Sequence, residues 1–555
     1  MTETGAVRPA RRRMTAQERK VIIASSAGTV FEWYDFYLAG ALAVNIGATF
    51  FSGVNPTAAL IFALLGFAAG FAVRPFGALV FGHFGDVIGR KYTFLVTMTV
   101  MGLSTFIIGL IPSYDTIGIV APVAFIACRL LQGLALGGEY GGAATYVAEH
   151  APQDRRGFYT SWIQTTATLG LLVSLLVILL LRQSMSEEAF NEWGWRVPFL
   201  LSVILLGVSL WIRLQLEESP AFQKIKSEGT QSKAPLTEAF RKWDNLKIGI
   251  FALLGGTAGQ AVVWYTGQFY ALLFLTTTLK MNGTSAIMAL ATALVIATPF
   301  FVIFGWLSDT IGRKKIIMTG CLLAALTYFP LFGALAYAVN PALMEAQRTS
   351  PVTVIADPDE CSFQFNPVGI ASFTSSCDVA KFFLARNAVN YANEEAPAGT
   401  NARILIGDVE IESFDAEIAG DDAPALTEAF NAAATDAIRA AGYPAEANPD
   451  EINMPLTIAI LTILVLYVTM VYGPIAALLV ELFPTRIRYS AMSLPYHIGN
   501  GWFGGFLPTL AFAIVAATGN IFYGLYYPIA IASMTFVVGM LFLPETKDRD
   551  IYADD

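Results

Sequence analysis

Four charged residues stand inside long apolar runs of this chain, and their types and spacing suit the binding of protons and anions. Glu32 and Asp35 lie three residues apart in one run, so both carboxylates share one face of a helix. Arg74 and Arg129 interrupt two later runs. A charge in such surroundings is costly unless it is paired or serves a pathway. A carboxylate facing Arg129 would make both charges tolerable, and protonation would weaken the pair, which predicts a proton-sensitive switch.

The acidic pair can be interpreted in two ways. Glu32 or Asp35 exchanges a proton, or the carboxylates form a permanent ion pair that only joins helices. Proton exchange is favoured, because two acids for one arginine leave an acid to spare. The sequence leaves open which carboxylate titrates.

Arg74 and Glu139 lie at similar depths in their apolar runs, so the two could pair. The pair would form an inner gate, or Arg74 would attract an anionic solute; a purely structural pair is an equal alternative. The run around Glu139 is rich in glycine, which lets other helices approach closely. These glycines are Gly133, Gly137, Gly138, Gly141 and Gly142.

Uncharged polar side chains in two further apolar runs suit the binding of a polar solute. Tyr265 and Gln268 lie in one run, and Asn500 lies in another. Such groups orient a solute through hydrogen bonds without the cost of a full charge. The ring of Tyr265 is equally suited to packing or to anchoring at a membrane interface, so its role stays open.

A polar motif occurs twice and indicates an internal duplication. The pattern Gly-x-x-x-Asp-x-x-Gly-Arg-Lys stands at residues 82–91 and again at 305–314, an offset of 223. Asp86 and Asp309 can each accept hydrogen bonds from loop arginines and cap a neighbouring helix N-terminus. Such contacts would hold one side of the protein shut and break when the halves move apart. If the motif served only to orient the protein in a membrane, this would explain its basic residues but not the matched aspartates and glycines.

A second repeated segment locates an insertion. Residues 149–156 match residues 481–488 at an offset of 332, so the second half contains 109 additional residues between its motifs. The polar stretch 340–452 is 113 residues long and accounts for the excess. The predicted gate residues from both repeats are Asp86, Arg90, Glu139, Glu149, Asp309, Arg313, Glu481 and Arg488.

The inserted stretch is predicted to be a small α/β domain. Residues 340–453 hold 19 acidic and 5 basic side chains, so the acidity of the chain is concentrated here. Residues 404–418 alternate apolar and acidic side chains like a pair of strands, and residues 426–441 have helical character. Cys361 and Cys377 are its only cysteines, and an oxidising compartment would permit a disulfide between them.

Apolar helices must position all of these residues. The chain has 555 residues, 55% of them hydrophobic and 14% charged, with a mean hydropathy of +0.57, which is too apolar for an ordinary soluble protein. Runs of about 20 apolar residues, long enough to cross a bilayer, occur twelve times, six in each half. They are residues 21–45, 57–82, 92–111, 117–142, 158–181, 196–214, 247–275, 284–307, 316–338, 454–480, 490–518 and 521–543.

The predicted fold is therefore an all-α membrane protein of twelve transmembrane helices in two pseudo-symmetric six-helix bundles. The small α/β insert lies between helices 9 and 10. With the N-terminus inside, the inside segments hold 24 Lys and Arg and the outside segments hold 8, while Arg74 and Arg129 fall within spans. Because basic loops stay in the cytoplasm, both termini are predicted to be cytoplasmic and the insert extracytoplasmic. In this count of Lys and Arg, Arg213 is included in the basic linker that follows the sixth span.

The predicted domains follow from these spans. They are the N-terminal tail 1–20, the N-terminal bundle 21–214, the cytoplasmic linker 215–246, helices 7–9 at 247–338, the insert at 339–453, helices 10–12 at 454–543, and the C-terminal tail 544–555.

Other kinds of chemistry are not indicated by the sequence. It holds no phosphate-binding Gly-x-x-x-x-Gly-Lys-Ser/Thr loop, so ATP is not expected to power it, and no Cys/His cluster with metal-ligand spacing. No nucleic-acid motif accompanies the basic linker. The insert contains no histidine and no set of nucleophile and base. An enzyme, a metal and a cofactor are therefore not expected.

Several motifs, in order, resemble those of the major facilitator superfamily. Within it they are similar to the metabolite:proton symporters, which include α-ketoglutarate, citrate, shikimate and proline/betaine permeases. The similarity covers residues 20–338 and 454–547 and departs at the insert, which compact members lack. The motifs are Glu-Trp-Tyr-Asp-Phe at 32–36, Arg-Pro-Phe-Gly at 74–77, Arg-Leu-Leu-Gln-Gly at 129–133, Gly-Gly-Glu-Tyr-Gly-Gly at 137–142, Gly-Trp-Arg-Val-Pro-Phe at 194–199 and Glu-Ser-Pro at 218–220.

The resemblance implies proton-driven uptake of a small organic anion, such as a mono- or dicarboxylate, across a bacterial inner membrane by alternating access. A zwitterionic osmolyte like proline or betaine is the alternative substrate, and a transporter-fold sensor that signals through its insert is a less favoured alternative. The expected partners are the substrate, protons and the lipid bilayer, and the expected state is a monomer. Glu32 and Asp35 are assigned to proton coupling. The predicted substrate-binding residues are Arg129, Arg74, Gln132, Tyr265, Gln268 and Asn500.

Overall fold

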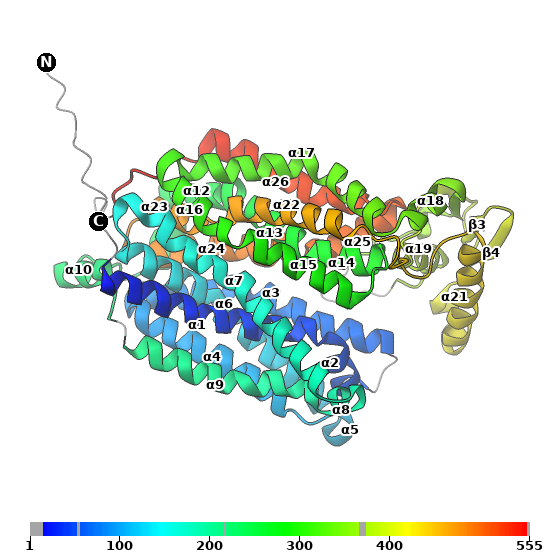
Figure 1. The fold of residues 1–555 in the computed structure, drawn as a ribbon, viewed down its shortest axis with the longest axis horizontal. Helices are drawn as coiled ribbons and strands as arrows, with labels where there is room; N and C mark the ends of the chain where they lie inside the picture. The colour runs from blue at the N-terminus through cyan, green and yellow to red at the C-terminus, as the bar shows by residue number, and fades with distance from the viewer. Residues whose placement is uncertain (1–14, 53–55, 216, 366–372, 552–555) are drawn as a thin grey trace, which may run out of the picture.

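The computed structural model describes residues 15–52, 56–215, 217–365 and 373–551, without several side chains near the start of its first helix and those of residues 56–68. Most of the predicted N-terminal tail and the last residues of the predicted C-terminal tail therefore lie outside the described residues. The described chain forms two helical halves that lie side by side along the long axis of the molecule. The insert projects from one end (Figure 1).

The N-terminal half consists of long helices joined by short turns. Its helices are α1 (Ala16–Ala41), α2 (Ala43–Phe50), α3 (Pro56–Val87), α4 (Arg90–Leu110), α5 (Tyr114–Ile117), α6 (Val120–His150), α7 (Arg156–Ser184), α8 (Glu187–Glu192) and α9 (Val197–Leu214). Two short helices, α10 (Pro220–Glu228) and α11 (Pro235–Arg241), follow in the linker.

The C-terminal half repeats this plan with more interruptions, because several of its spans contain wider π-type turns. One span runs from α12 (Trp243–Ala252) through α13 (Ala258–Tyr265) and α14 (Ala271–Leu273). The other helices are α15 (Gly283–Ala297), α16 (Pro299–Ile311), α17 (Arg313–Val339), α22 (Met454–Tyr472), α23 (Ile475–Leu482), α24 (Arg488–Ile498), α25 (Leu507–Thr518) and α26 (Tyr526–Phe542).

Ten helical segments in the described part of the chain are long and apolar enough to cross a membrane. They coincide with the third to the twelfth predicted spans, and α1 and α3 occupy the first and second. The chain is a multi-pass membrane protein, as predicted.

Each copy of the repeated motif turns the chain at its second glycine. Gly89 lies between α3 and α4 at φ 135°, and Gly312 lies between α16 and α17 at φ 115°. A side chain rarely adopts this backbone conformation, so glycine is required at both turns. The duplication seen in the sequence is therefore also a duplication of backbone geometry.

Glycines of α6 bring α3 into backbone contact, which confirms the close approach expected from the glycine-rich run. A Cβ atom added at Gly133 would collide with the carbonyl oxygen of Gly70, and one at Gly137 would collide with that of Arg74. Small residues at such a seam let two membrane helices pack along their backbones. The contact fixes the depth and the direction of Arg74.

The insert contains a four-stranded sheet with the order β2-β1-β3-β4. β1 and β2 pair in parallel through the crossover helix α19, whereas β3 and β4 form an antiparallel hairpin. The hairpin lies in the stretch predicted as a strand pair, and α21 matches the predicted helix. The elements are α18 (Pro341–Thr349), β1 (Val352–Ala356), α19 (Ser376–Arg386), β2 (Tyr391–Glu395), β3 (Arg403–Ile406), β4 (Val409–Glu412), α20 (Ala416–Ala419) and α21 (Ala423–Ala440).

The insert is bonded to itself and to the C-terminal half. A disulfide joins Cys361 to Cys377. The backbone N–H of Tyr391 donates to the carbonyl of Gly519 at 2.8 Å, just beyond α25. The N–H of Ala447 donates to the carbonyl of Lys280 at 3.0 Å, just before α15. These contacts attach the insert to two turns at one end of the C-terminal half.

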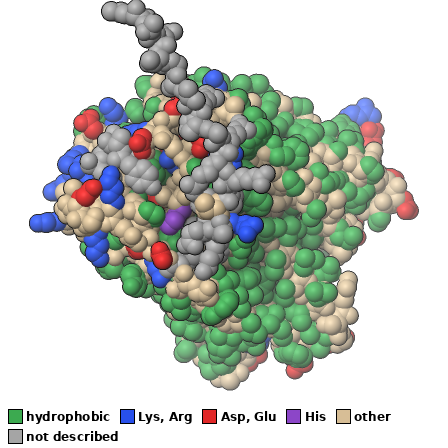
Figure 2. Space-filling model, turned by 60° about the vertical axis from the view of Figure 1, so that its left-hand side comes forward, with side chains coloured by type: hydrophobic (Ala, Val, Ile, Leu, Met, Phe, Trp, Pro, Cys, Tyr) green, Lys and Arg blue, Asp and Glu red, His purple; other side chains and the backbone are tan. Residues whose placement is uncertain are grey.

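The surface divides into an apolar flank and charged ends. Figure 2 shows hydrophobic side chains covering the flank, with Lys, Arg, Asp and Glu gathered at the end that is on the left of Figure 1. Large apolar side chains such as Leu180, Trp211 and Val295 are more than half exposed on the flank. A surface of this kind suits lipid contact rather than water.

Gly137→Ala is expected to lower the melting temperature of the detergent-solubilised protein, because the added methyl group meets backbone atoms of Arg74 and its neighbours. Overpacking of this kind costs about 1–3 kcal/mol. Gly207→Ala is the matched control, since a Cβ at Gly207 in α9 meets nothing within 4 Å. Equal melting temperatures for the two variants would contradict the backbone contact between α3 and α6.

Candidate functional site

Arg74 is fully buried in α3 and lies against aromatic rings. Its guanidinium carbon is 4.5 Å from the centroid of the Phe36 ring and 4.3 Å from that of Phe71. The side chain also contacts the Tyr265 hydroxyl of the other half. Its Nε and Nη2 find no hydrogen-bond acceptor among the described residues. Buried donors left unmet cost free energy that a bound anion would recover.

Arg129 lies on the other side of the same phenylalanine. Its guanidinium carbon is 5.0 Å from the centroid of Phe36, and its Nη1 donates to Oε1 of Gln132 at 2.5 Å. Gln132 in turn donates from Nε2 to the Thr105 hydroxyl at 2.6 Å. Two predicted substrate-binding residues are therefore linked in one polar network that reaches α4.

Aromatic rings from both halves meet around this site. Trp33 stacks on Tyr37 with ring centroids 5.6 Å apart, and it lies 6.2 Å from Trp264 of the C-terminal half. Phe71 packs edge-on against Tyr265 at 5.6 Å. The two arginines thus come from the N-terminal half, while part of the aromatic wall comes from the C-terminal half. Trp33, Tyr37 and Trp264 were not predicted; for Trp33 and Tyr37 the available signal was the cluster of aromatic residues beside Glu32.

The three uncharged polar candidates differ in their surroundings. Both amide atoms of Gln268 are buried without a hydrogen-bond partner in the described chain, so they are available to a solute. Asn500 is not available in the same way, because its amide exchanges hydrogen bonds with Gln260 at 3.1 and 3.3 Å. It also donates to the Tyr496 carbonyl at 3.0 Å. Asn500 therefore joins two helical segments of one half, a role that the spacing alone did not indicate.

A stack of tyrosines continues the site toward the C-terminal half. The rings of Tyr140 in α6 and Tyr496 in α24 lie parallel with centroids 3.5 Å apart. The Tyr496 and Tyr472 hydroxyls are 2.7 Å apart, and the Gln164 amide donates to the Tyr140 hydroxyl at 2.7 Å. These residues were not predicted. They add a second contact between the halves beside the arginines.

The predicted pairing of a carboxylate in the first span with Arg129 is wrong. Glu32 instead accepts a hydrogen bond from Nη1 of Arg213 at 2.7 Å, and both side chains are buried. Asp35 accepts a hydrogen bond from the Ser202 hydroxyl at 2.5 Å. Arg213 and Ser202 both belong to α9. Each helix residue is turned about 100° from the next, so Phe36 faces the arginine site while Asp35 faces α9.

Asp35 nevertheless connects to Arg129 indirectly. The Thr105 side chain that accepts from Gln132 also makes a side-chain hydrogen bond with Asp35. A chain of polar contacts therefore runs from Arg129 through Gln132 and Thr105 to Asp35. Arg213 was missed as a buried charge because it ends its apolar run and was counted among the linker cations.

The predicted pairing of Arg74 with Glu139 is also wrong. Both carboxylate oxygens of Glu139 are buried and without a hydrogen bond to any described residue. The Arg74 backbone lies against Gly137, which directs its side chain into the aromatic site. Glu139 is two residues beyond Gly137 and hence about 200° around α6, so it projects from nearly the opposite side.

Asp86 caps a helix of the opposite half, as its motif predicted. Its carboxylate accepts hydrogen bonds from the backbone N–H groups of Tyr489 and Ser490 at 3.3 and 2.8 Å, at the start of α24. Arg90 lies 3.3 Å from the same carboxylate and donates to the Thr485 carbonyl at 2.8 Å. The contacts with Tyr489, Ser490 and Thr485 cross from the N-terminal half to the C-terminal half, and the pair of Arg90 with Asp86 supports them.

Asp309 makes the equivalent contact in the reverse direction. Its carboxylate accepts from the N–H groups of Gly157 and Phe158, each at 2.8 Å, at the start of α7. Arg313 lies 2.6 Å from Asp309 and 3.1 Å from Glu481. Each copy of the motif therefore caps one helix that belongs to the opposite half.

Two ion pairs complete this arrangement. Glu149 pairs with Arg488 at 2.9 Å, and Glu481 pairs with Arg156 at 2.8 Å, each across the two halves. Arg156 was not among the predicted gate residues, although the 332-residue repeat aligns it with Arg488. We call the following eight residues the charge lock: Asp86, Arg90, Glu149, Arg156, Asp309, Arg313, Glu481 and Arg488. All but Asp309 are buried. Glu149 also accepts a hydrogen bond from Ser219 at the start of α10, so the lock lies at the end of the molecule that carries α10 (Figure 1).

A third matched pair of carboxylates supports the motif turns. Glu218 accepts from the backbone N–H of Lys91 at 3.3 Å, and Glu545 accepts from that of Lys314 at 3.2 Å. Each glutamate stands a few residues beyond the last helix of its half. This shared position after the last helix of each half is the signal in the sequence for the pair of glutamates.

Two related helical halves that enclose a buried polar site and are joined by charge pairs at one end define a membrane transporter. The family model described as "Sugar (and other) transporter" matches residues 20–352 and 429–553. The chain belongs to this family of the major facilitator superfamily and is a transporter, not an enzyme.

Curated relatives carry transport functions for several metabolites. The shikimate transporter of Escherichia coli is 35% identical over 335 residues, covering 58% of this chain and 73% of the relative. The α-ketoglutarate permease of Escherichia coli is 35% identical, covering 58% and 72%. The proline/betaine transporter of Salmonella typhimurium is 36% identical, covering 57% of this chain and 64% of that protein.

Solved structures share the fold at low identity. The proton:xylose symporter XylE, bound to 6-bromo-6-deoxy-D-glucose, aligns with a TM-score of 0.60 and 15% identity over 97% of this chain and 98% of that one. The family model leaves residues 353–428 unmatched. The unmatched stretch lies within the insert, which is where the sequence departs from the superfamily pattern.

Asp86→Asn is expected to loosen the charge lock, because a neutral amide caps α24 more weakly than a carboxylate does. The reporter is Ser493→Cys, a buried position in α24, probed by its labelling rate with a water-soluble thiol reagent. Loss of a charged hydrogen bond corresponds to roughly tenfold faster labelling. Background is low, since Cys128 and Cys321 are buried and the other two cysteines are bonded.

Asp244→Asn is the matched control for this experiment. Asp244 lies at the start of α12 with its side chain 93% exposed, and its substitution should leave labelling unchanged. Unchanged labelling in Asp86→Asn as well would show that the cap does not hold the halves together.

Proposed function

We propose that this protein is a proton-coupled symporter that takes up a small organic anion, such as a mono- or dicarboxylate, by alternating access. The observation that carries the proposal is Arg74. Its guanidinium is fully buried at the boundary between the halves and keeps two donor nitrogens without an acceptor in the described structure. A substrate carboxylate between Arg74 and Arg129 would satisfy those donors and be held against both halves at once.

Aromatic faces and one free amide would complete the substrate site. Phe36 separates the two arginines and fixes their directions. Tyr265 and Gln268 approach from the C-terminal half, so a bound substrate would touch both bundles. Contact with both halves is what allows a substrate to bias a rocking motion, since it binds one arrangement better than the other.

Two acidic sites are candidates for the proton. Asp35 is connected to Arg129 by a chain of hydrogen bonds through Thr105 and Gln132, so its charge would respond to substrate bound at that arginine. Glu32 pairs with Arg213, and protonation of Glu32 would release the arginine. In either case one proton changes the charge balance beside the substrate site, which is the coupling that symport requires.

The charge lock supports alternating access. Its contacts cross between the halves at one end, so that end opens only when they break. The caps by Asp86 and Asp309 are directional hydrogen bonds that form in one arrangement of the halves and not in another. This gives the two-state element on which substrate and proton would act.

Orientation follows from the distribution of charge. The charge lock lies at the same end as α10 of the basic linker, and the insert lies at the opposite end (Figure 1). Because basic segments stay in the cytoplasm, the termini and the linker are cytoplasmic and the insert, residues 339–453, is periplasmic in this proposal. Relatives named as inner membrane transport proteins support that membrane.

A zwitterionic osmolyte is the second candidate substrate. Trp33, Tyr37 and Trp264 form an aromatic wall beside the arginines, and such faces attract a quaternary ammonium group. The carboxylate of a betaine would occupy the same guanidinium. Relatives named as proline/betaine transporters make this class a direct competitor of the carboxylates.

Uptake of radiolabelled α-ketoglutarate, shikimate and glycine betaine into proteoliposomes with an imposed inward proton gradient separates these classes. A carboxylate is expected to accumulate, and a protonophore should abolish the accumulation. Arg74→Gln should reduce uptake roughly tenfold to a hundredfold, since a charged hydrogen bond is lost. Arg348→Gln is the control, because that arginine is exposed on the insert and paired with Glu345. Uptake that is unaffected by the protonophore would contradict proton coupling. Uptake of glycine betaine alone would favour a zwitterionic osmolyte as the substrate.

Glu32→Gln and Asp35→Asn identify the proton carrier. The variant that removes the carrier is expected to lose accumulation driven by the gradient while keeping substrate exchange between equal pools, because its amide still accepts a hydrogen bond but releases no proton. Glu228→Gln, at an exposed position of α10, should behave like the parent protein. Full accumulation in both variants would exclude both carboxylates as carriers.

A further inference from the structure

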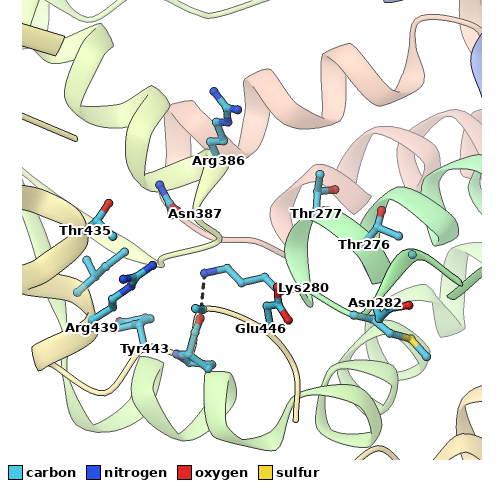
Figure 3. Close-up of a pocket in the computed structure, with 15 residues that line it drawn as sticks. Thr276, Thr277, Lys280, Asn282, Arg386, Asn387, Thr435, Arg439, Tyr443 and Glu446 are labelled. Atoms are coloured by element: carbon cyan, nitrogen blue, oxygen red, sulfur yellow. Dashed lines mark hydrogen bonds between the residues drawn. The ribbon is translucent and has the colours of Figure 1, made fainter. Parts of the chain in front are cut away.

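A polar pocket of about 430 Å³ lies where the insert meets the C-terminal half. One wall is the turn between the end of the α12–α14 span and the start of α15. The other walls are the C-terminal ends of α19 and α21 and the segment that follows α21 (Figure 3). The residues that line the pocket do not include any residue of the arginine site between the halves.

Two cations converge in this pocket. Figure 3 shows the side chains of Lys280 and Arg439 extending toward each other, whereas Arg386 points away. Lys280 donates from Nζ to the Pro444 carbonyl at 3.1 Å. Within the described chain neither cation forms a salt bridge, although the carboxylate of Glu446 also lines the pocket. Burial and the nearby Arg439 lower the pKa of Lys280, which means that its positive charge is incompletely compensated.

The backbone holds Lys280 in the pocket at a cost. Lys280 has φ 55°, and only one other described residue besides glycine, Ala388, has a positive φ. A non-glycine residue in this conformation is strained, because its Cβ lies too close to the following carbonyl oxygen. The hydrogen bond from the Ala447 N–H to the Lys280 carbonyl secures the strained turn from the insert side. Glycine would relieve the strain here, so the presence of lysine points to a use for its side chain.

Neither the local composition nor a helix dipole accounts for both cations. Arg439 belongs to the insert, which has 19 acidic and only 5 basic residues, and Lys280 belongs to the C-terminal half. The convergence of the two cations is therefore not explained by the composition of the insert. Arg439 lies in the last turn of α21, where a cation complements the helix dipole, but Lys280 lies in no helix. The remaining polar lining consists of hydroxyls and amides from Thr276, Thr277, Asn282, Asn387 and Thr435.

We propose that this pocket binds a small organic anion that carries carboxylate and hydroxyl groups, at a site separate from the one between the halves. Lys280 and Arg439 bind a carboxylate, and the threonine hydroxyls and asparagine amides bind the ligand's own hydroxyls. The pocket volume fits a molecule of metabolite size. An anion between the two cations removes their mutual repulsion and stabilises the seam between insert and bundle.

Titration calorimetry of the full-length, detergent-solubilised protein with citrate tests this site. Arg74→Gln is used as the background, because it weakens the site between the halves. Citrate is expected to bind with one site per chain in that background. Lys280→Gln and Arg439→Gln should each weaken binding about tenfold or more, since each removes a charged partner. Arg403→Gln is the matched control, because this arginine is exposed on the hairpin of the insert and pairs with Glu410 outside the pocket.

Each outcome bears on the inference. Binding that survives Arg74→Gln and Arg403→Gln but is weakened by both pocket variants supports it. Binding unaffected by the pocket variants, or absent from the Arg74→Gln background at millimolar citrate, overturns it and leaves the proposed transport function untouched. Inorganic phosphate serves as the comparison probe: if it binds through the same two cations and citrate does not, the organic class is overturned. Arg439→Gln alters an exposed side chain, so loss of folding is not an explanation for its effect.

Discussion

The structure depends above all on how it compensates arginines that are buried away from water. Taking such a charge out of water costs several kcal/mol unless partners replace the lost hydration. In the charge lock, carboxylates supply those partners: Arg488 meets Glu149, and Arg156 meets Glu481. At Arg74 the compensation is partial, because aromatic faces attract the cation but accept few of its hydrogen bonds. The difference separates a closed contact between the halves from a buried cation whose donors are only partly satisfied.

Duplication makes this compensation reciprocal between the halves. Asp86 of one half caps a helix of the other, and Asp309 returns the same contact, so neither half can move away without losing both. The contacts are few and directional, and each is worth only about 1–3 kcal/mol. That scale is suited to an equilibrium between two arrangements, since a substrate or a proton contributes a comparable free energy. The turns at Gly89 and Gly312 place the two aspartates equivalently.

The insert adds an independent layer. It is attached to two turns of the C-terminal half, at Lys280 and Gly519, and is braced internally by a disulfide. Any movement of the C-terminal half relative to the other would therefore carry the insert with it. The pocket at Lys280 lies in this seam, so a ligand bound there would stiffen the attachment. The insert and the site between the halves can in this way respond to separate ligands.

The sequence by itself determined the membrane class, the duplication, the positions of the spans and seven of the eight residues of the lock, because these depend on local hydrophobicity and on repeat spacing. It also marked the hairpin and one helix of the insert, whose periodicity is local. Only the tertiary structure decided the partners of buried charges. Glu32 faces Arg213 and not Arg129, because the rotation of α1 against its neighbours is set by packing along the whole helix. Arg74 and Glu139 project in different directions for the same reason, since a close backbone seam at Gly137 leaves no freedom to turn either side chain toward the other.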